Sequence, residues 1–201
     1  MKLLLILLLS CGAAVSSGAQ MTGDKSGEGS LSVDQMIEDF YSGDPSTLSR
    51  AKEKLMKIAQ QSPESRSEVV QRLITVLDDP RTAQVTYSNA WYASAELLGG
   101  LKAKEAIDAL VRHLDYTNGV AGLSSSHVPA VKALTKIGKP AVPTLSVALS
   151  DYRPSIREKA AQALGGIGGE EAMAALESAS KSETDKNVQF YIAKALQAAK
   201  R

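Results

Sequence analysis

The sequence has few of the residues that carry out covalent or metal chemistry. It contains one cysteine, Cys11, and two histidines, His113 and His127, and neither histidine has a glutamate or a second histidine four residues further on. This excludes the usual spacing of a metal site built on one helix. No Gly-x-Ser-x-Gly nucleophile motif occurs either. The sequence therefore predicts a protein that is not an enzyme and that holds no metal or cofactor.

Net charge is also nearly absent. Lysine and arginine together number 23, and aspartate and glutamate together number 22. Proteins that bind nucleic acid usually carry a basic face, so this balance argues against a nucleic-acid partner. Charges of both signs alternate along the chain, as in Lys52-Glu53-Lys54, which is typical of a solvated helix surface.

Residues 1–19 have the pattern of a signal peptide. Lys2 supplies one positive charge, Leu3 to Leu9 form an unbroken apolar run, and small residues lead to Ser17-Gly18-Ala19, which suits signal peptidase. The run is shorter than the roughly 20 apolar residues that span a bilayer. We therefore predict export, with cleavage after Ala19 and a secreted or periplasmic location.

Cys11 leaves a second N-terminal processing route open. It directly follows Leu8-Leu9-Ser10, and this segment resembles a bacterial lipobox, in which the cysteine thiol receives a diacylglycerol. The protein would then be a membrane-anchored lipoprotein, and this anchor would be its contact with a membrane.

Residues 20–31 are polar and rich in glycine and serine, which predicts a flexible linker. Residues 32–201 form the predicted repeat domain. Its first helix begins at Ser32, because Ser32 and Gln35 have the spacing of a helix N-terminal capping box. Apolar residues then recur with helical period as far as Phe40, and this short helix is expected to cap the first repeat.

From Asp44 onward the chain repeats a two-helix unit. In the clearest copy, apolar residues that share one helix face lead to a glycine: Ile156, Ala160, Ala163, Leu164, Ile167 and Gly168. The preceding copy ends in the same way at Gly138, and Lys102 stands at the glycine position of the copy before it. The second helices share an apolar triplet: Val70-Leu73-Leu77, Ile107-Leu110-Leu114 and Val142-Leu145-Leu149. A helix pair that recurs every 30 to 40 residues is typical of a helical solenoid.

Proline placement supports these helix boundaries. Pro63, Pro140 and Pro154 each stand at the first position of a predicted helix. The backbone N–H that proline lacks has no hydrogen-bond partner at that position in any case. The glycines at 138 and 168 are expected to end their helices in the left-handed αL conformation.

The repeated residues resemble the HEAT-like repeat family, in particular the bacterial repeats first associated with phycobilisome lyases. The likeness is carried by a branched apolar residue with arginine, an Ala-Leu pair, an Ile-Gly turn and an acidic-Ala start: Ile156-Arg157, Ala163-Leu164, Ile167-Gly168 and Glu171-Ala172. The resemblance implies an all-α, right-handed solenoid of about four helix pairs with N- and C-terminal capping helices. Such repeats serve many unrelated partners, so the resemblance informs the fold more than the function.

Three neighbouring aromatic residues are the candidate contact site. Tyr87, Trp91 and Tyr92 occur within six positions, and tyrosine and tryptophan are enriched at binding hot spots. Packing in the joint between two repeats is the alternative explanation. The long connection 117–126, TNGVAGLSSS, is either functional or merely mobile. His113 is expected at a helix end or on the surface, and His127 in a polar loop.

These features together predict a monomeric, non-catalytic scaffold or adaptor outside the cytoplasm. Its partner would be another protein, bound on the solenoid surface lined by the second helices. The alternative is an accessory subunit or lyase-like repeat protein that positions a substrate or chromophore. That function would require reactive groups that converge on one face, and the sequence does not suggest any.

Overall fold

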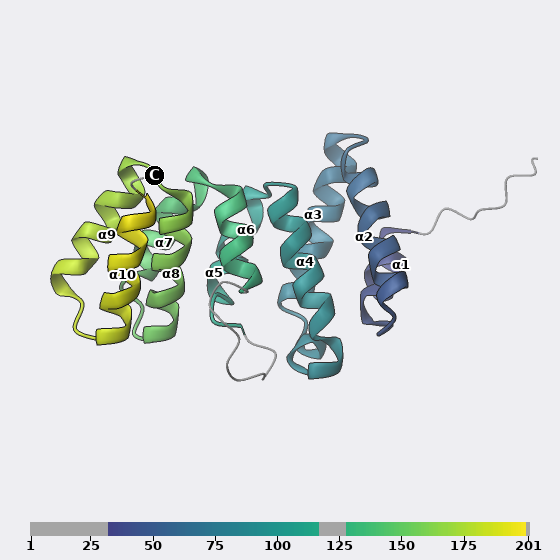
Figure 1. The fold of residues 1–201 in the computed structure, drawn as a ribbon. Coiled ribbons are helices and arrows are strands. Elements are labelled where there is room, and N and C mark those ends of the chain that lie inside the picture. The colour runs from purple at the N-terminus through teal and green to yellow at the C-terminus, as the bar shows by residue number, and fades with distance from the viewer. Residues whose placement is uncertain (1–31, 117–127, 200–201) are drawn as a thin grey trace, which may run out of the picture. The chain divides into compact units, whose positions relative to one another are not determined.

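The computed structural model describes residues 32–116 and 128–199, and within these ranges every regular element is a helix. The α-helices follow one another in chain order (Figure 1): α1 Val33–Glu38, α2 Pro45–Ala59, α3 Pro63–Leu77, α4 Ser88–Gly100, α5 Ile107–Arg112, α6 Pro129–Ile137, α7 Val142–Ala148, α8 Pro154–Ile167, α9 Glu170–Ser182 and α10 Lys186–Ala199. Short 3-10 turns join some of them: η1 Asp39–Tyr41, η2 Pro80–Ala83, η3 Val85–Tyr87, η4 Lys104–Ala106 and η6 Lys139–Ala141.

The described residues, 32–116 and 128–199, form a helical solenoid. The first helices of the pairs, α2, α4, α6, α8 and α10, each contact the next first helix and make one layer. The second helices α3, α5, α7 and α9 contact one another in the same order and make the other layer. Four helix pairs are thus stacked, with α10 closing the first-helix layer, and the predicted α-solenoid is confirmed. The handedness of the stack stays a prediction.

Helix starts agree with the sequence-based expectation. Ser32 Oγ accepts a hydrogen bond from the backbone N–H of Gln35 at 3.2 Å, so Ser32 is the N-cap of α1. Helix α1 then packs against both α2 and α3, which is the capping position predicted for it. Prolines open α2, α3, α6 and α8 at the first helical position. Pro140 differs slightly, because it lies in the 3-10 turn η6 that precedes α7.

The turns that end the first helices require positive φ, but the αL prediction is wrong in detail. Gly138 has φ 82° and ψ −142°, and Gly168 has φ 68° and ψ −170°. These ψ values are extended, so both glycines occupy a region that is essentially restricted to glycine. Lys102, at the equivalent place after α4, also has positive φ, at 49°. The tight connection to the second helix imposes this backbone geometry.

The core runs along the interface between the two layers. The three complete second-helix triplets are buried, and so are Ala160, Ala163 and Leu164 of α8. One helix pair has no opposite surface against which to bury its apolar face, so adjacent pairs must share this core.

Glycines set the spacing between neighbouring first helices. A Cβ added at Gly99 of α4 would lie 2.7 Å from Ala133 Cα of α6, and one at Gly165 of α8 would lie 2.7 Å from Ala195 Cα of α10. Real Cβ atoms do not come this close to a backbone carbon. Helix α4 can therefore lie this close to α6, and α8 this close to α10, because residues 99 and 165 have no side chain.

Candidate interaction surfaces

A groove lies on the second-helix layer between α5 and α7. It has a volume of about 460 Å³ and is bounded on one side by the start of α8. Its lining combines apolar and charged side chains: Asp108, Val111, Arg112, Thr144, Val147, Ala148, Ser150, Asp151, Arg153 and Ile156. Val147 is 76% exposed, and Tyr152, which is next to the lining residue Asp151, is 86% exposed. Val147 thus presents an apolar side chain to solvent in the groove, and Tyr152 presents an aromatic one next to a lining residue.

Acidic residues in the turns that follow the second helices form a ladder of ion pairs along the stack. Asp78, after α3, accepts from Arg112 Nη2 at 2.9 Å and contacts His113 Nε2 at 2.6 Å. Asp115, after α5, lies 3.6 Å from Arg153 Nη1. The hydrogen bond with His113 is the main cause that holds the pKa of Asp78 below its usual range. Each acidic turn is therefore bound to a cation of the next helix pair.

Asp151 continues the ladder, and Asp108 stands outside it. Arg153 donates to Asp151 through both its backbone N–H, at 2.8 Å, and its Nε, at 3.1 Å, and this lowers the pKa of Asp151. Asp108 has no ion-pair partner among the residues that the structure describes. It is the carboxylate in the groove lining that remains available to a cationic group.

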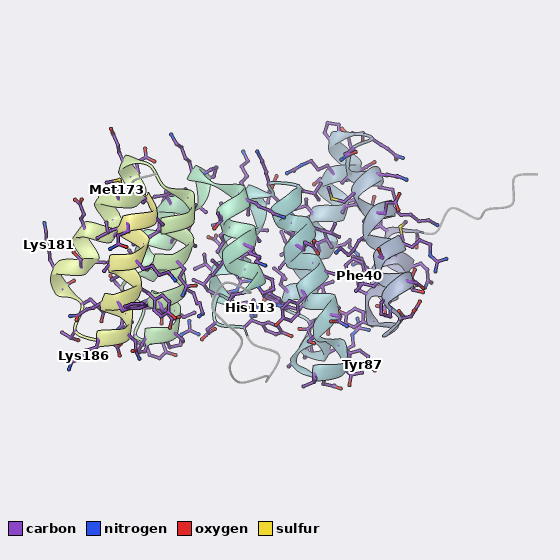
Figure 2. All side chains as sticks on the ribbon, in the orientation of Figure 1. Phe40, Tyr87, His113, Met173, Lys181 and Lys186 are labelled. Carbon is purple, nitrogen blue, oxygen red and sulfur yellow. The ribbon has the colours of Figure 1, made fainter. Side chains whose placement is uncertain are left out.

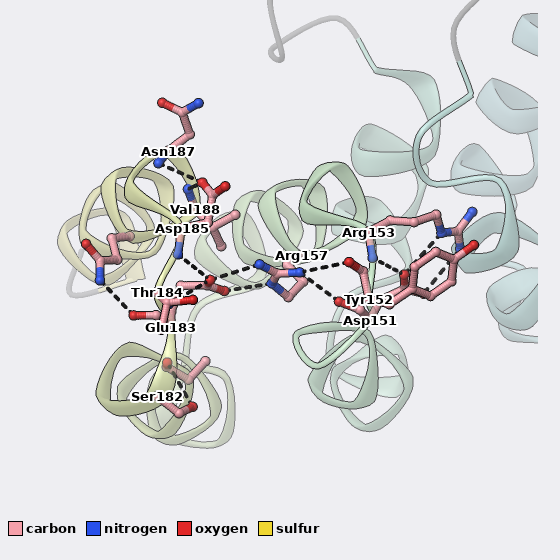
Figure 3. Close-up of polar contacts among 12 residues, drawn as sticks. Asp151, Tyr152, Arg153, Arg157, Ser182, Glu183, Thr184, Asp185, Asn187 and Val188 are labelled. Atoms are coloured by element: carbon pink, nitrogen blue, oxygen red, sulfur yellow. Dashed lines mark hydrogen bonds and ion pairs between the residues drawn. The ribbon is translucent and has the colours of Figure 1, made fainter.

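The ladder is most enclosed between α8 and α10 (Figure 3). Arg157 donates from Nε and Nη2 to the two carboxylate oxygens of Glu183, at 2.7 and 2.9 Å, and from Nη1 to the carbonyl of Asp151 at 2.9 Å. Glu183 also accepts from the backbone N–H groups of Thr184 and Asp185 at 3.0 and 2.9 Å. The Glu183 side chain is only 6% exposed, and these donors, Arg157 first, lower its pKa to about 2.

A second polar network joins the capping segment to the turn after α3. Tyr41 Oη donates to Asp79 Oδ2 at 2.8 Å, and the Arg81 guanidinium lies over the Tyr41 ring at 3.9 Å. Arg81 also donates to both carboxylate oxygens of Glu38 at 3.0 and 3.1 Å. Burial, with the hydrogen bond to Asp79, raises the pKa of Tyr41. These contacts hold α1 and η1 on the first helix pair.

The structure places the three aromatic residues that the sequence groups together in different surroundings. Tyr87 is the last residue of η3 and lies edge-on to Tyr41, with ring centroids 5.9 Å apart. Trp91 is in α4 and is completely buried, which is the packing alternative considered above. Tyr92 is half-buried and meets Trp91 edge-on at 6.1 Å. A partner-binding role for Tyr87 and Tyr92 stays a prediction, whereas Trp91 has no surface to offer without rearrangement.

Trp91 belongs to an aromatic cluster with partners that the sequence analysis did not identify. Tyr116 stacks on it with a centroid separation of 4.1 Å and an interplanar angle of 13°. His113, at the end of α5, meets it edge-on at 6.4 Å, and Figure 2 shows the position of His113 between the neighbouring helix pairs. Burial raises the pKa of Tyr116 to about 12. Tyr116 Oη also donates to the carbonyl of Thr82 in η2, so the cluster that contains Trp91 connects the α4–α5 pair to the turn after α3.

Val147 and Tyr152 are surface residues that the sequence analysis missed, although a signal was present. Val147 is two residues after Leu145 in α7, and this places it away from the buried face defined by Val142, Leu145 and Leu149. A valine on the solvent side of a helix was therefore visible in the helical period.

The described ranges also lack two other kinds of feature. No group of three or more histidine, cysteine, aspartate or glutamate side chains in residues 32–116 and 128–199 is arranged to hold a metal ion. No helix in these ranges is both long and apolar enough to span a bilayer. Cys11, His127 and the connection 117–126 lie outside the described residues.

Helical-repeat solenoid is the class of protein that this architecture defines. Residues 128–197 match the family model for HEAT repeats, and this segment comprises α6 to α10 with their connections. The HEAT-like resemblance is thereby supported for this part of the chain, whereas the phycobilisome-lyase subtype is not.

Comparison with solved structures finds other helical proteins at low similarity. An engineered protein is 24% identical, covers 83% of this chain and 78% of its own, and has a TM-score of 0.40. A designed armadillo repeat protein in complex with the peptide (KR)4 is 18% identical over 84% of this chain and 100% of its own, with a TM-score of 0.33. Human deoxyhypusine hydroxylase in complex with glycerol is 15% identical over 84% and 96%, with a TM-score of 0.31. A comparison with curated proteins found no match.

Proposed function

We propose that this protein is a non-catalytic interaction scaffold that binds another protein in the groove between α5 and α7. The observation that carries the proposal is the exposure of Val147 and Tyr152 at the groove. Burying exposed apolar surface of this kind stabilises a complex by about 25 cal/mol per Å² before the costs of association. A helical-repeat solenoid also presents an extended surface suited to a polypeptide partner.

The groove favours a partner segment that places an apolar side chain beside a basic one. The apolar side chain would pack against Val147, and the basic group would pair with Asp108, whose carboxylate has no ion-pair partner in the described residues. The other carboxylate in the groove lining, Asp151, is paired with Arg153.

The groove carboxylates support a binding role better than a catalytic one. A general acid or base that works near neutral pH needs a carboxyl pKa raised toward 7. The pKa of Asp151, in the groove lining, is instead lowered by the hydrogen bond from Arg153, and the pKa of Asp78, in the turn after α3, is lowered by the hydrogen bond with His113. The accessory-subunit alternative would require reactive groups in the groove, and these two carboxylates are held as ion-pair partners.

The partner proposal is tested with two matched valine variants. Val147→Arg puts a long cation into the groove, at the last turn of α7, where a positive charge suits the helix dipole. Val85→Arg makes the same change at a valine that is 64% exposed in η3, outside the groove. We expect the protein that co-purifies with the wild type and with Val85→Arg to be lost with Val147→Arg. Recovery of the same partner with both variants would place the binding surface elsewhere.

We also propose that the scaffold acts outside the cytoplasm. The support is the apolar run Leu3–Leu9, the small residues before Ala19 and the polar linker that follows. The intact mass of the protein isolated from its natural source distinguishes three outcomes. A chain that starts at Gln20 indicates secretion, a lipid-modified chain that starts at Cys11 indicates an anchored lipoprotein, and an unprocessed chain contradicts export.

A further inference from the structure

The first helices carry an excess of positive charge, although the chain as a whole is nearly neutral. The five first helices contain ten lysines and arginines: Arg50, Lys52, Lys54, Lys57, Lys132, Lys136, Arg157, Lys159, Lys186 and Lys194. They contain three carboxylates, Glu53, Glu96 and Glu158. The remaining described residues hold nine cations and seventeen carboxylates. Positive charge is thus concentrated in the first-helix layer.

Ion pairing within the layer leaves a set of unpaired cations. Each of the three glutamates is held by a lysine: Glu53 by Lys57, Glu96 by Lys52 and Glu158 by Lys159. Arg157 points to Glu183 and belongs to the ladder. The six remaining cations are exposed and have no ion pair in the described residues: Arg50, Lys54, Lys132, Lys136, Lys186 and Lys194. We call these six residues the basic face.

The basic face extends along the stack. Its residues come in pairs on α2, α6 and α10, helices that are linked by α4 and α8 in the same layer. The paired residues on α2 and on α6 are four positions apart, and so share one side of their helix. Lys186 extends from the start of α10, as Figure 2 shows. These cations are distributed along the layer and are not gathered around one cavity.

An exposed aromatic residue lies between the two lysines of α10. Phe190 is four positions from both Lys186 and Lys194, and it is 63% exposed. The Tyr191 ring lies edge-on to it at 5.4 Å. Lysines that flank an aromatic side chain are typical of helices that lie at the surface of an anionic membrane, because the ring enters the headgroup region and the ammonium groups stay with the phosphates.

We propose that the basic face lies against a membrane surface rich in anionic phospholipids. An extended anionic surface matches separate cations along several helices, whereas one bound phosphate would require donors that converge on one point. The groove with Val147 is in the other layer, so a scaffold held in this way keeps the groove open to its partner. The inference rests on the charge distribution and on the exposure of Phe190, and it does not depend on the proposed groove partner or on lipidation of Cys11.

The test compares two triple variants that remove the same charge from different layers. Lys54, Lys132 and Lys136 are each changed to glutamine in the first variant. Lys104, Lys139 and Lys181, which are exposed and outside the first helices, are each changed to glutamine in the control. The full chain is used in all cases, and binding is measured by flotation with vesicles of phosphatidylcholine containing phosphatidylglycerol, and with phosphatidylcholine alone, over a range of salt concentrations. Salt weakens charge pairing and does not weaken insertion of the apolar run 3–9, so the salt-dependent part reports the lysines.

We expect salt-dependent binding to the phosphatidylglycerol vesicles, reduced at least tenfold in the first variant and less than twofold in the control, since each lysine near such a surface contributes about fivefold. Circular dichroism checks that both variants are folded. Equal losses in the two variants would show that net charge alone matters and would overturn the proposal. The proposal is also overturned if the wild type does not bind the vesicles in a salt-dependent way. If the wild type then binds polyglutamate or nucleic acid in a salt-dependent way, the basic face is assigned to a polyanionic macromolecule.

Discussion

Substituting alanine at two adjacent glycines of α4 should have opposite effects on stability. Alanine favours the helix over glycine by about 1 kcal/mol at either position. At Gly100, which is exposed, the nearest atom to the added Cβ is Met56 Cε at 3.8 Å, an ordinary contact. Gly100→Ala should therefore raise the free energy of unfolding by up to about 1 kcal/mol.

Gly99→Ala should destabilise the protein. Its Cβ would lie 2.7 Å from Ala133 Cα and 3.1 Å from Ala133 Cβ. Carbon atoms in contact are normally about 3.5 to 4.0 Å apart, so α6 would have to move away from α4 by about 1 Å. Overpacking of this kind typically costs about 1 to 3 kcal/mol, which exceeds the gain in helix propensity. We expect a net loss of up to about 2 kcal/mol.

Urea and thermal denaturation, followed by circular dichroism and by the fluorescence of Trp91, measure both effects. A difference of about 1 to 3 kcal/mol between the variants corresponds to roughly 2 to 12 °C in Tm for a domain of this size. The closest clash is with a backbone atom, so adding Ala133→Gly to Gly99→Ala should not restore stability. The reasoning is refuted if Gly99→Ala is as stable as Gly100→Ala, or if Ala133→Gly rescues it.

Three further predictions concern buried and paired groups. Glu183→Gln should lower stability at pH 7 by about 3 kcal/mol, because the folded state holds the carboxyl pKa at about 2 and its ordinary value is 4.5. This stabilisation is complete above about pH 4.5 and is lost as pH falls toward 2. The free energies of unfolding of the variant and the wild type, measured in urea, should therefore become equal in acid. A difference that does not change with pH would contradict the ion pair with Arg157. Trp91→Ala should cost about 3 to 5 kcal/mol by thermal denaturation, since the indole is fully buried, and an unchanged Tm would contradict that burial. Tyr41→Phe should cost about 1 kcal/mol in urea denaturation through loss of the hydrogen bond to Asp79, and no loss would show that this contact is not formed in solution.

Helix positions and the buried face of each helix were predictable from local sequence. The triplet Val142-Leu145-Leu149 repeats at helical spacing, and each of its members is buried as expected. Proline 63 and proline 154 each begin a helix, because the fixed φ of proline suits that position. These features depend on residues within a few positions of one another, and such local constraints can be read from one chain.

The candidate site could be predicted only in part. The acidic residues Asp78, Asp115 and Asp151 follow the second helices in the sequence. The arginine that pairs with Asp78 is 34 residues further along the chain, and the arginine that pairs with Asp115 is 38 residues further along. Helical period also could not distinguish an exposed Trp91 from a buried one, because both explanations place it on a helix. Its burial follows from contact with Tyr116, which comes from the end of the same repeat.

Local patterns in the amino-acid sequence specify a stack of helix pairs, because each helix carries one apolar face and cannot bury it alone. The surfaces that remain for partners depend on how these pairs stack. Alternate helices enter different layers, so the excess of lysine and arginine gathers in the first-helix layer, whereas the ladder of carboxylates lies in the turns that follow the second helices. The distance between α4 and α6 likewise depends on a tertiary contact, between Gly99 and Ala133. Whether a glycine inside a helix permits close packing depends on which residue lies against it, and the sequence of one helix does not contain that information.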